Sequence, residues 1–147
     1  MVDKLVKKPL VVLAAGGTGG HVYPALALAK VLNKKDFDVV LLTDFRGIDY
    51  FSGYDTFQKM IIRSDTLTGK TPLRKIKSIL SIIYGVLQTW FIITKLKPSI
   101  IIGFGGYASF PTMIAALFRN CGKIIHEQNA VLGRVNSLFA KRVDIIA

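Results

Sequence analysis

The sequence predicts an α/β domain with a parallel sheet covered by helices on both faces. Short, nearly continuous runs of Val, Ile and Leu recur along the 147 residues and read as buried strands. Runs typical of helices separate most of them, which is the pattern of a three-layer, Rossmann-like fold. In addition, two of the strand-like runs lead into glycine-rich turns. The length is that of one domain.

Each element can be placed from its local pattern. The expected strands cover Leu10–Ala15, Val39–Thr43, Gln58–Arg63, Ser99–Phe104, Lys123–His126 and Val143–Ala147. The expected helices cover Pro24–Lys34, Pro72–Lys97, Pro111–Arg119 and Gly133–Ala140. Gly47 and Gly53 indicate a loop or short helix between the second and third strands. Because the last strand reaches Ala147, it is either an edge strand or part of a longer protein.

The first glycine-rich turn follows directly on the first strand. Gly16-Gly17-Thr18-Gly19-Gly20 is followed by Pro24, which we expect in the first turn of the next helix. Such a turn directs backbone N–H groups and the positive end of a helix dipole at an anion. We therefore expect a phosphate or diphosphate ligand; the alternative is a tight turn without a ligand. The turn is neither a complete dinucleotide fingerprint nor an NTPase P-loop.

Two further loops are expected at the same edge of the sheet. Gly103-Phe104-Gly105-Gly106-Tyr107 is a second glycine turn between a strand and a helix. The carboxyl ends of parallel strands meet at one edge, so the two turns can face each other across a crevice and suit a diphosphate. His126-Glu127-Gln128-Asn129 follows the fifth strand and can bind a sugar or activate a hydroxyl. The alternative for this loop is a structural cap on the next helix.

The charge is strongly positive and unevenly distributed. The formal net charge is +11, and no acidic residue occurs between Asp65 and Glu127. A block of one sign indicates an anionic partner, namely nucleic acid, anionic lipid or a phosphorylated substrate; a solvated basic face is the alternative. The two histidines are far apart and Cys121 is the single cysteine, so we expect no metal site.

The long helix expected at 72–97 is more apolar than a sheet-covering helix requires. Ser78 to Thr94 carries no charge, and the apolar residues cover about twice the arc that one buried face needs. We expect this helix to lie on an anionic membrane surface rather than to span the membrane; a buried core helix is the alternative. The expected membrane contacts are Arg74, Lys75, Lys77, Trp90, Phe91 and Lys95.

Taken together, the three loops closely resemble the MurG family of bacterial N-acetylglucosaminyltransferases. The resemblance covers essentially the whole chain and implies the N-terminal, acceptor-binding domain (1–147) of a two-domain GT-B enzyme, without its C-terminal domain for the UDP-sugar. It implies inverting transfer of N-acetylglucosamine from UDP-N-acetylglucosamine to undecaprenyl-diphosphoryl-muramyl pentapeptide in peptidoglycan synthesis. It also implies no cofactor, no nucleic-acid partner and a peripheral location on the cytoplasmic face of the plasma membrane. This chain alone is then expected to have little or no transferase activity.

The resemblance also implies roles for individual residues. His21 is the first candidate for the general base and Glu127 the second. Thr18, Gly19, Gly20 and Asn129 match family positions that reach the donor. The remaining expected substrate-binding residues are Gly17, Gly105, Gly106, Tyr107 and Gln128.

Two other functions remain open at this point. The chain could be a non-catalytic, membrane-anchoring subunit of a split glycosyltransferase. It could also be a dinucleotide-binding oxidoreductase domain in which Asp44, after the second strand, binds a ribose.

Overall fold

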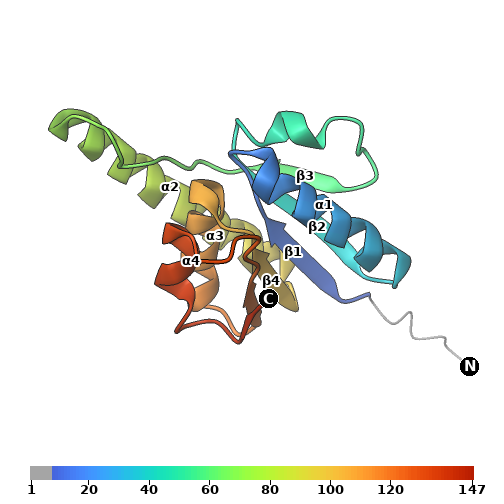
Figure 1. The fold of residues 1–147 in the computed structure, drawn as a ribbon. Coiled ribbons are helices and arrows are strands. Elements are labelled where there is room, and N and C mark those ends of the chain that lie inside the picture. Colours follow the sequence, from blue (N-terminus) through green and yellow to red (C-terminus); the bar gives the residue numbers. More distant parts are fainter. Residues whose placement is uncertain (1–7) are drawn as a thin grey trace, which may run out of the picture.

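The computed structural model describes residues 8–147 and contains one six-stranded parallel sheet (Figure 1). The strands are β1 (Leu10–Ala14), β2 (Asp38–Thr43), β3 (Gln58–Ile61), β4 (Ile100–Gly103), β5 (Gly122–Ile125) and β6 (Ile145–Ile146). Their order in the sheet is β3-β2-β1-β4-β5-β6, and every neighbouring pair is parallel. This is the expected Rossmann-like order, and it reverses between β1 and β4.

Helices connect the strands as the sequence predicts. They are α1 (Gly19–Lys34), the short 3-10 helix η1 (Ile48–Phe51), α2 (Pro72–Leu96), α3 (Gly106–Leu117) and α4 (Arg134–Phe139). The crevice of such a fold opens beyond the carboxyl ends of the strands on either side of the reversal. Both glycine turns lie there, because one follows β1 and the other follows β4.

Alternate residues of each strand supply two separate cores. Val11 and Leu13 pack with α1 and η1 on one face of the sheet. Val12 and Ala14 pack with α2, α3 and α4 on the other. All four of these side chains are buried, so β1 is fixed from both faces. A strand held on two faces provides a rigid base for the turn that follows it.

The starts of α1 and α3 correct the sequence-based expectation. The helices begin at Gly19 and Gly106, five residues before Pro24 and Pro111, which lie inside them. Proline is tolerated there at the cost of one helical hydrogen bond, which for Pro24 would go to the carbonyl of Gly20. The glycines therefore form the first helical turns themselves instead of a loop leading to them.

A buried carboxylate, that of Asp44 after β2, holds the first glycine turn in place. Asp44 Oδ1 accepts hydrogen bonds of 2.9 Å from the backbone N–H groups of both Gly17 and Gly47. Its Oδ2 accepts two bonds of 3.1 Å from Arg46 and one of 3.4 Å from Ser64. The loops after β1, β2 and β3 are thus tied to a single side chain.

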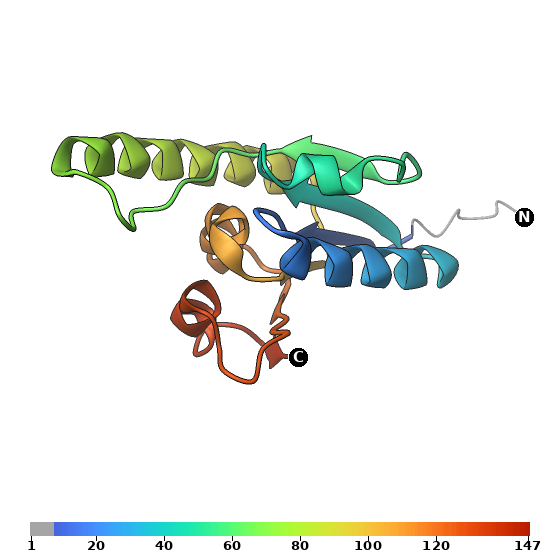
Figure 2. The same ribbon diagram turned by 45° about the horizontal axis from the view of Figure 1, so that its top comes forward.

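Helix α2 extends beyond the rest of the domain, as both views show (Figures 1 and 2). Its buried stripe consists of Ser78, Gly85, Thr89 and Ile93. The opposite side exposes Leu73, Ile76, Ile79, Leu80, Ile83, Tyr84, Leu87 and Phe91. A deeply buried core helix is therefore the wrong description, and the expected surplus of apolar surface faces solvent. By length and composition alone, α2 could cross a membrane.

We expect Asp44→Asn to destabilise the domain by about 2 kcal/mol, because an amide keeps one oxygen for Gly17 and Gly47 but has no charge and turns N–H donors toward Arg46. Urea unfolding followed by circular dichroism measures the change. Asp49→Asn is the matched control, since Asp49 is exposed and its side chain has no hydrogen bond within residues 8–147. Equal effects of the two substitutions would contradict the role assigned to Asp44.

Candidate functional site

A polar cavity of about 350 Å³ lies at the carboxyl edge of the sheet, beside the reversal between β1 and β4. Loops after three different strands contribute to it. The lining residues are His21, Gly105, Gly106, Tyr107, Glu127, Asn129, Gly133, Arg134, Val135 and Asn136.

The first glycine turn ends in the N-terminus of α1. Thr18 is extended, and its carbonyl accepts bonds of 3.2 Å from the N–H groups of His21 and Val22. The N–H groups of Gly19 and Gly20 lie in the first turn of α1, where the helix has no carbonyl four residues earlier to accept their hydrogen bonds. They are therefore free for a ligand. A Cβ added at Gly20 would have only Thr18 Oγ1 near it, at 3.8 Å. The turn is thus an open group of backbone donors.

The second glycine turn packs directly against the first. Gly105 and Gly106 have φ angles of +82° and +70°, which side-chain-bearing residues rarely adopt. A Cβ on Gly106 would lie 2.9 Å from Cδ2 and 3.1 Å from Nε2 of His21. The imidazole edge therefore rests on a surface that only glycine can provide. This contact brings the two turns face to face, as expected for neighbouring turns at one sheet edge.

His21 is oriented from the third loop. Its Nδ1 lies 2.9 Å from Nε2 of the Gln128 amide. With the amide as placed, Gln128 donates and the ring proton resides on Nε2. A half-turn of the amide would present Oε1 to an Nδ1–H group and leave Nε2 free to accept a proton. Gln128 thus orients the ring of His21, and the direction of the Gln128 amide decides which ring nitrogen carries the proton.

Glu127 organises its own loop. Its carboxylate accepts hydrogen bonds from the backbone N–H of Gly133 at 2.7 Å and from Asn129 at 2.7 and 3.1 Å. It accepts another, at 3.0 Å, from the buried amide of Asn136. Partial burial acts to raise the pKa of Glu127, but these hydrogen bonds outweigh it and hold the pKa below its usual range. A carboxylate so bonded is a weak proton acceptor.

Tyr107 and Arg134 form one wall of the cavity. The Tyr107 hydroxyl lies 3.0 Å from Thr68 Oγ1. Hydrogen bonds to Thr66, Thr68 and Arg134, together with the charge of Arg134, outweigh partial burial and lower the pKa of Tyr107. Sequence reasoning missed Arg134 and Asn136. The one signal for Asn136 is that this polar residue lies with Val135 and Phe139 on the buried side of α4.

The structure brings most of the predicted site residues together. The cavity is lined by His21, Gly105, Gly106, Tyr107, Glu127 and Asn129. Gln128 does not line it but contacts His21, which does. Gly17, Thr18, Gly19 and Gly20 are not among its lining residues and form the adjoining turn.

The predicted membrane contacts lie apart from the cavity, on α2. Arg74, Lys75 and Lys77 are exposed near its start, and Lys95 is exposed near its end. Phe91 is exposed, whereas Trp90 is half-buried and packs edge-on against Phe118 at 6.2 Å. Trp90 therefore contributes less free surface than the sequence pattern indicates.

The arrangement does not suit the dinucleotide alternative. Both oxygens of Asp44 are occupied by bonds from Gly17, Gly47 and Arg46, so this carboxylate supports the turn and is not free to bind a ribose.

Comparison with known proteins identifies the family. Residues 11–147 match the glycosyltransferase family 28 N-terminal domain. The chain belongs to this family. The resemblance found in the three loops is thereby confirmed, and so is the Rossmann-like, parallel α/β fold.

Curated relatives agree with the family. The chain is 44% identical over 139 residues to a protein of Rhodopseudomonas palustris, and 45% identical over 141 residues to one of Paramagnetospirillum magneticum. Both are named UDP-N-acetylglucosamine--N-acetylmuramyl-(pentapeptide) pyrophosphoryl-undecaprenol N-acetylglucosamine transferase. The matches cover 95% and 96% of this chain but 38% of each relative, so the chain spans about two fifths of their length.

Solved structures show the same fold. The crystal structure of MurG from Acinetobacter baumannii matches 95% of this chain and 40% of its own, with a TM-score of 0.80 and 30% identity. The kitacinnamycin glycosyltransferase matches 91% of this chain and 34% of its own, with a TM-score of 0.65. At 12% identity the second likeness concerns the fold alone.

We expect Glu127→Gln to lower stability at neutral pH and to matter less in acid. The folded-state pKa of Glu127 lies below the ordinary value of 4.5, so its contribution is fully present above pH 4.5 and is lost as pH falls through the folded pKa. Urea unfolding midpoints of wild type and variant should therefore converge as pH falls from 7. A difference that is constant with pH would contradict the assigned hydrogen bonds.

Proposed function

We propose that this chain is the acceptor-binding part of an N-acetylglucosaminyltransferase of peptidoglycan synthesis. The complete enzyme would transfer N-acetylglucosamine from UDP-N-acetylglucosamine to a muramyl pentapeptide on undecaprenyl diphosphate, as the names of the curated relatives state for those proteins. One observation carries the proposal beyond family membership: the two glycine turns contact each other through His21, which lines the cavity beside the first turn together with Gly105 and Gly106.

The crevice suits a diphosphate and a sugar. Free N–H groups at the start of α1 bind phosphate oxygens, and the helix dipole adds to the attraction. Glycine at 20 lets such a group approach the backbone, because no side chain intervenes. Glycine at 105 and 106 lets the side chains of Asn136 and His21 pack against the second turn. Asn129 and Tyr107 supply neutral hydrogen-bonding groups in or beside the same cavity for sugar hydroxyls. We assign Thr18, Gly19, Gly20 and Asn129 to the side that meets the donor.

His21 is the proposed general base. The C4 hydroxyl of the muramyl sugar attacks the anomeric carbon of N-acetylglucosamine, and the bond from that carbon to UDP breaks with inversion. The hydroxyl proton passes to Nε2 of His21, which accepts it when the Gln128 amide presents Oε1 to an Nδ1–H group, while UDP leaves with the bonding electron pair. Gln128 is a positioning residue for His21. Glu127 is the weaker candidate, because its oxygens already accept bonds from Gly133, Asn129 and Asn136.

The exposed face of α2 is the proposed membrane contact. A polyprenol-linked acceptor lies in a membrane, so the enzyme must meet it at the surface. Apolar side chains such as Leu80 and Leu87 are more than half exposed on α2, and exposed Lys75 and Lys77 lie near its start. This combination is typical of helices that lie in the plane of an anionic interface. We therefore place the protein on the cytoplasmic face of the bacterial plasma membrane as a peripheral protein.

We expect His21→Ala to lower transferase turnover about 100-fold or more in the complete enzyme carrying this domain, because general bases contribute that much. Gln128→Ala should cost less, since it removes only the orienting bond. Steady-state assays with purified acceptor measure both. If His21→Ala is mild and Glu127→Ala is severe, their roles are exchanged; if neither matters, the loops of the site serve the structure only.

We expect residues 1–147 alone to bind UDP-N-acetylglucosamine weakly or not at all. The chain spans 38% of its curated relatives, and we assign most of the nucleotide site to the part of those proteins that it does not match. Isothermal titration calorimetry measures the affinity. Micromolar binding of the donor by this chain would overturn its assignment to the acceptor side.

We expect this domain to bind anionic vesicles reversibly and to be released by salt. Because each basic residue near such a surface adds roughly 1 kcal/mol, Lys75→Gln with Lys77→Gln should weaken binding roughly 30-fold at low salt. Lys34→Gln with Lys35→Gln is the matched control at the end of α1. Co-sedimentation measures both pairs. Retention through alkaline carbonate extraction would instead indicate a membrane-spanning helix.

A further inference from the structure

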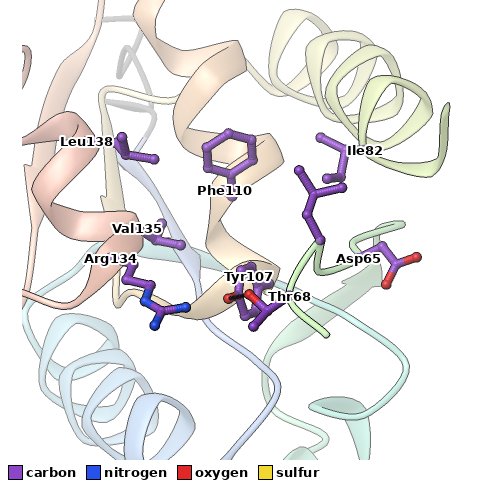
Figure 3. A pocket seen from close by; sticks show the side chains of 9 residues that line it. Asp65, Thr68, Ile82, Tyr107, Phe110, Arg134, Val135 and Leu138 are labelled. Carbon is purple, nitrogen blue, oxygen red and sulfur yellow. Dashed lines mark hydrogen bonds between the residues drawn. The ribbon is translucent and has the colours of Figure 1, made fainter. Parts of the chain in front are cut away.

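A second, apolar pocket adjoins the polar cavity (Figure 3). It has a volume of about 190 Å³ and lies between α2, α3, α4 and the segment that leads into α2. Its lining residues are Asp65, Leu67, Thr68, Ile82, Tyr107, Phe110, Arg134, Val135 and Leu138. None of the apolar residues that line this pocket has a role in the reaction proposed at His21.

The two cavities lie side by side and share part of their lining. Tyr107, Arg134 and Val135 line both of them. In Figure 3, Arg134 and Tyr107 lie at one end beside Thr68, while Phe110, Leu138 and Ile82 surround the apolar interior. An anionic group in the polar cavity and an apolar group in the pocket could therefore belong to one molecule.

The charges at this junction favour an anion. Within residues 8–147, no carboxylate lies close enough to Arg134 to form an ion pair. The one acidic residue of the pocket, Asp65, is paired with Lys70 at 2.6 Å, and its carboxylate points away from the apolar interior (Figure 3). The guanidinium of Arg134 meets the neutral Tyr107 hydroxyl and is not neutralised by a carboxylate among these residues, and a guanidinium binds phosphate oxygens well.

We propose that this pocket holds the first isoprene unit of a polyprenyl diphosphate acceptor and that Arg134 binds the phosphate beside it. The inference rests on the proposed function and adds how the lipid end of the acceptor is recognised. A polyprenyl diphosphate has a branched, five-carbon apolar unit bonded directly to the diphosphate. This order of groups matches the spatial order of the apolar pocket, Arg134 and the glycine turns.

Size and position agree with this occupant. An engineered apolar cavity of about 150 Å³ binds benzene, so 190 Å³ accommodates a five-carbon unit. Ile82 lines the pocket from α2, the helix whose outer face we place on the membrane. The rest of a long polyprenyl chain would then pass from the pocket along α2 into the bilayer. A nucleoside fits poorly, because apolar walls leave its polar groups without partners.

Calorimetric titration of the 147-residue chain with farnesyl diphosphate and with inorganic pyrophosphate tests the proposal. The informative quantity is the ratio of the two affinities at one salt concentration. We expect farnesyl diphosphate to bind roughly tenfold more tightly or better, because the pocket removes its first isoprene unit from water. Arg134→Gln should weaken farnesyl diphosphate binding roughly tenfold, whereas Lys141→Gln, which removes one exposed charge after α4, should not.

Paired substitutions separate the pocket from the outer face of α2. Leu67→Gln with Leu138→Gln changes two partly exposed pocket residues and should abolish the preference for farnesyl diphosphate. Val31→Gln with Phe118→Gln changes two exposed apolar residues elsewhere and should preserve it. If Leu80→Gln with Leu87→Gln abolishes the preference and the pocket pair does not, the lipid binds the outer face of α2 and the proposal is wrong.

The outcomes also distinguish this inference from the proposed function. Equal affinities for pyrophosphate and farnesyl diphosphate would overturn the lipid pocket and leave the diphosphate site at the glycine turns intact. Absence of binding for both ligands would contradict the diphosphate site and the pocket together. Unchanged farnesyl diphosphate binding by Arg134→Gln would remove Arg134 from the recognition of the phosphate.

Discussion

The site depends on the close contact between His21 and the turn formed by Gly105 and Gly106. A Cβ at Gly106 would come within 2.9 Å of the imidazole, so the contact requires glycine. It joins the start of α1 to the start of α3 across the point where the strand order reverses. Because the two helix starts are fixed to each other, free N–H groups and a titratable ring share one crevice.

Three carboxylates near the site serve structure. Asp44 binds the N–H groups of Gly17 and Gly47, Glu127 binds Gly133, Asn129 and Asn136, and Asp65 binds Lys70. Asp44 and Asp65 are paired with Arg46 and Lys70, whereas Glu127 is bonded only to neutral donors and keeps its negative charge in the cavity lining. The groups that remain available to an anion are backbone donors, amides and Arg134, and the proposed site relies on these.

Much of the fold could be predicted from the sequence, because buried parallel strands and their connecting helices leave clear apolar patterns. The predicted strand bounds lie within a few residues of the observed ones, and the three loops converge at one edge of the sheet. The predicted starts of α1 and α3 are wrong, since proline near a helix start reads as its first turn even when glycines such as Gly19 precede it. The predicted start of α2 at Pro72 is confirmed. Asp44 and Asn136 act through contacts between residues far apart in the chain, which periodicity does not reveal. The role proposed for Arg134 depends on its position beside Tyr107 and the pocket between the helices, which the sequence alone does not show.

Amide chemical shifts of this chain during titration with inorganic pyrophosphate test the central claim most directly. We predict saturable shifts at Gly19, Gly20, Gly105 and Gly106 together, with one common affinity, and their loss in Gly20→Ala. That substitution fits the fold, because a Cβ at Gly20 meets nothing closer than 3.8 Å, but it places a methyl group at the start of α1. Shifts confined to one turn, or unchanged binding by Gly20→Ala, would contradict a single diphosphate site made by both turns.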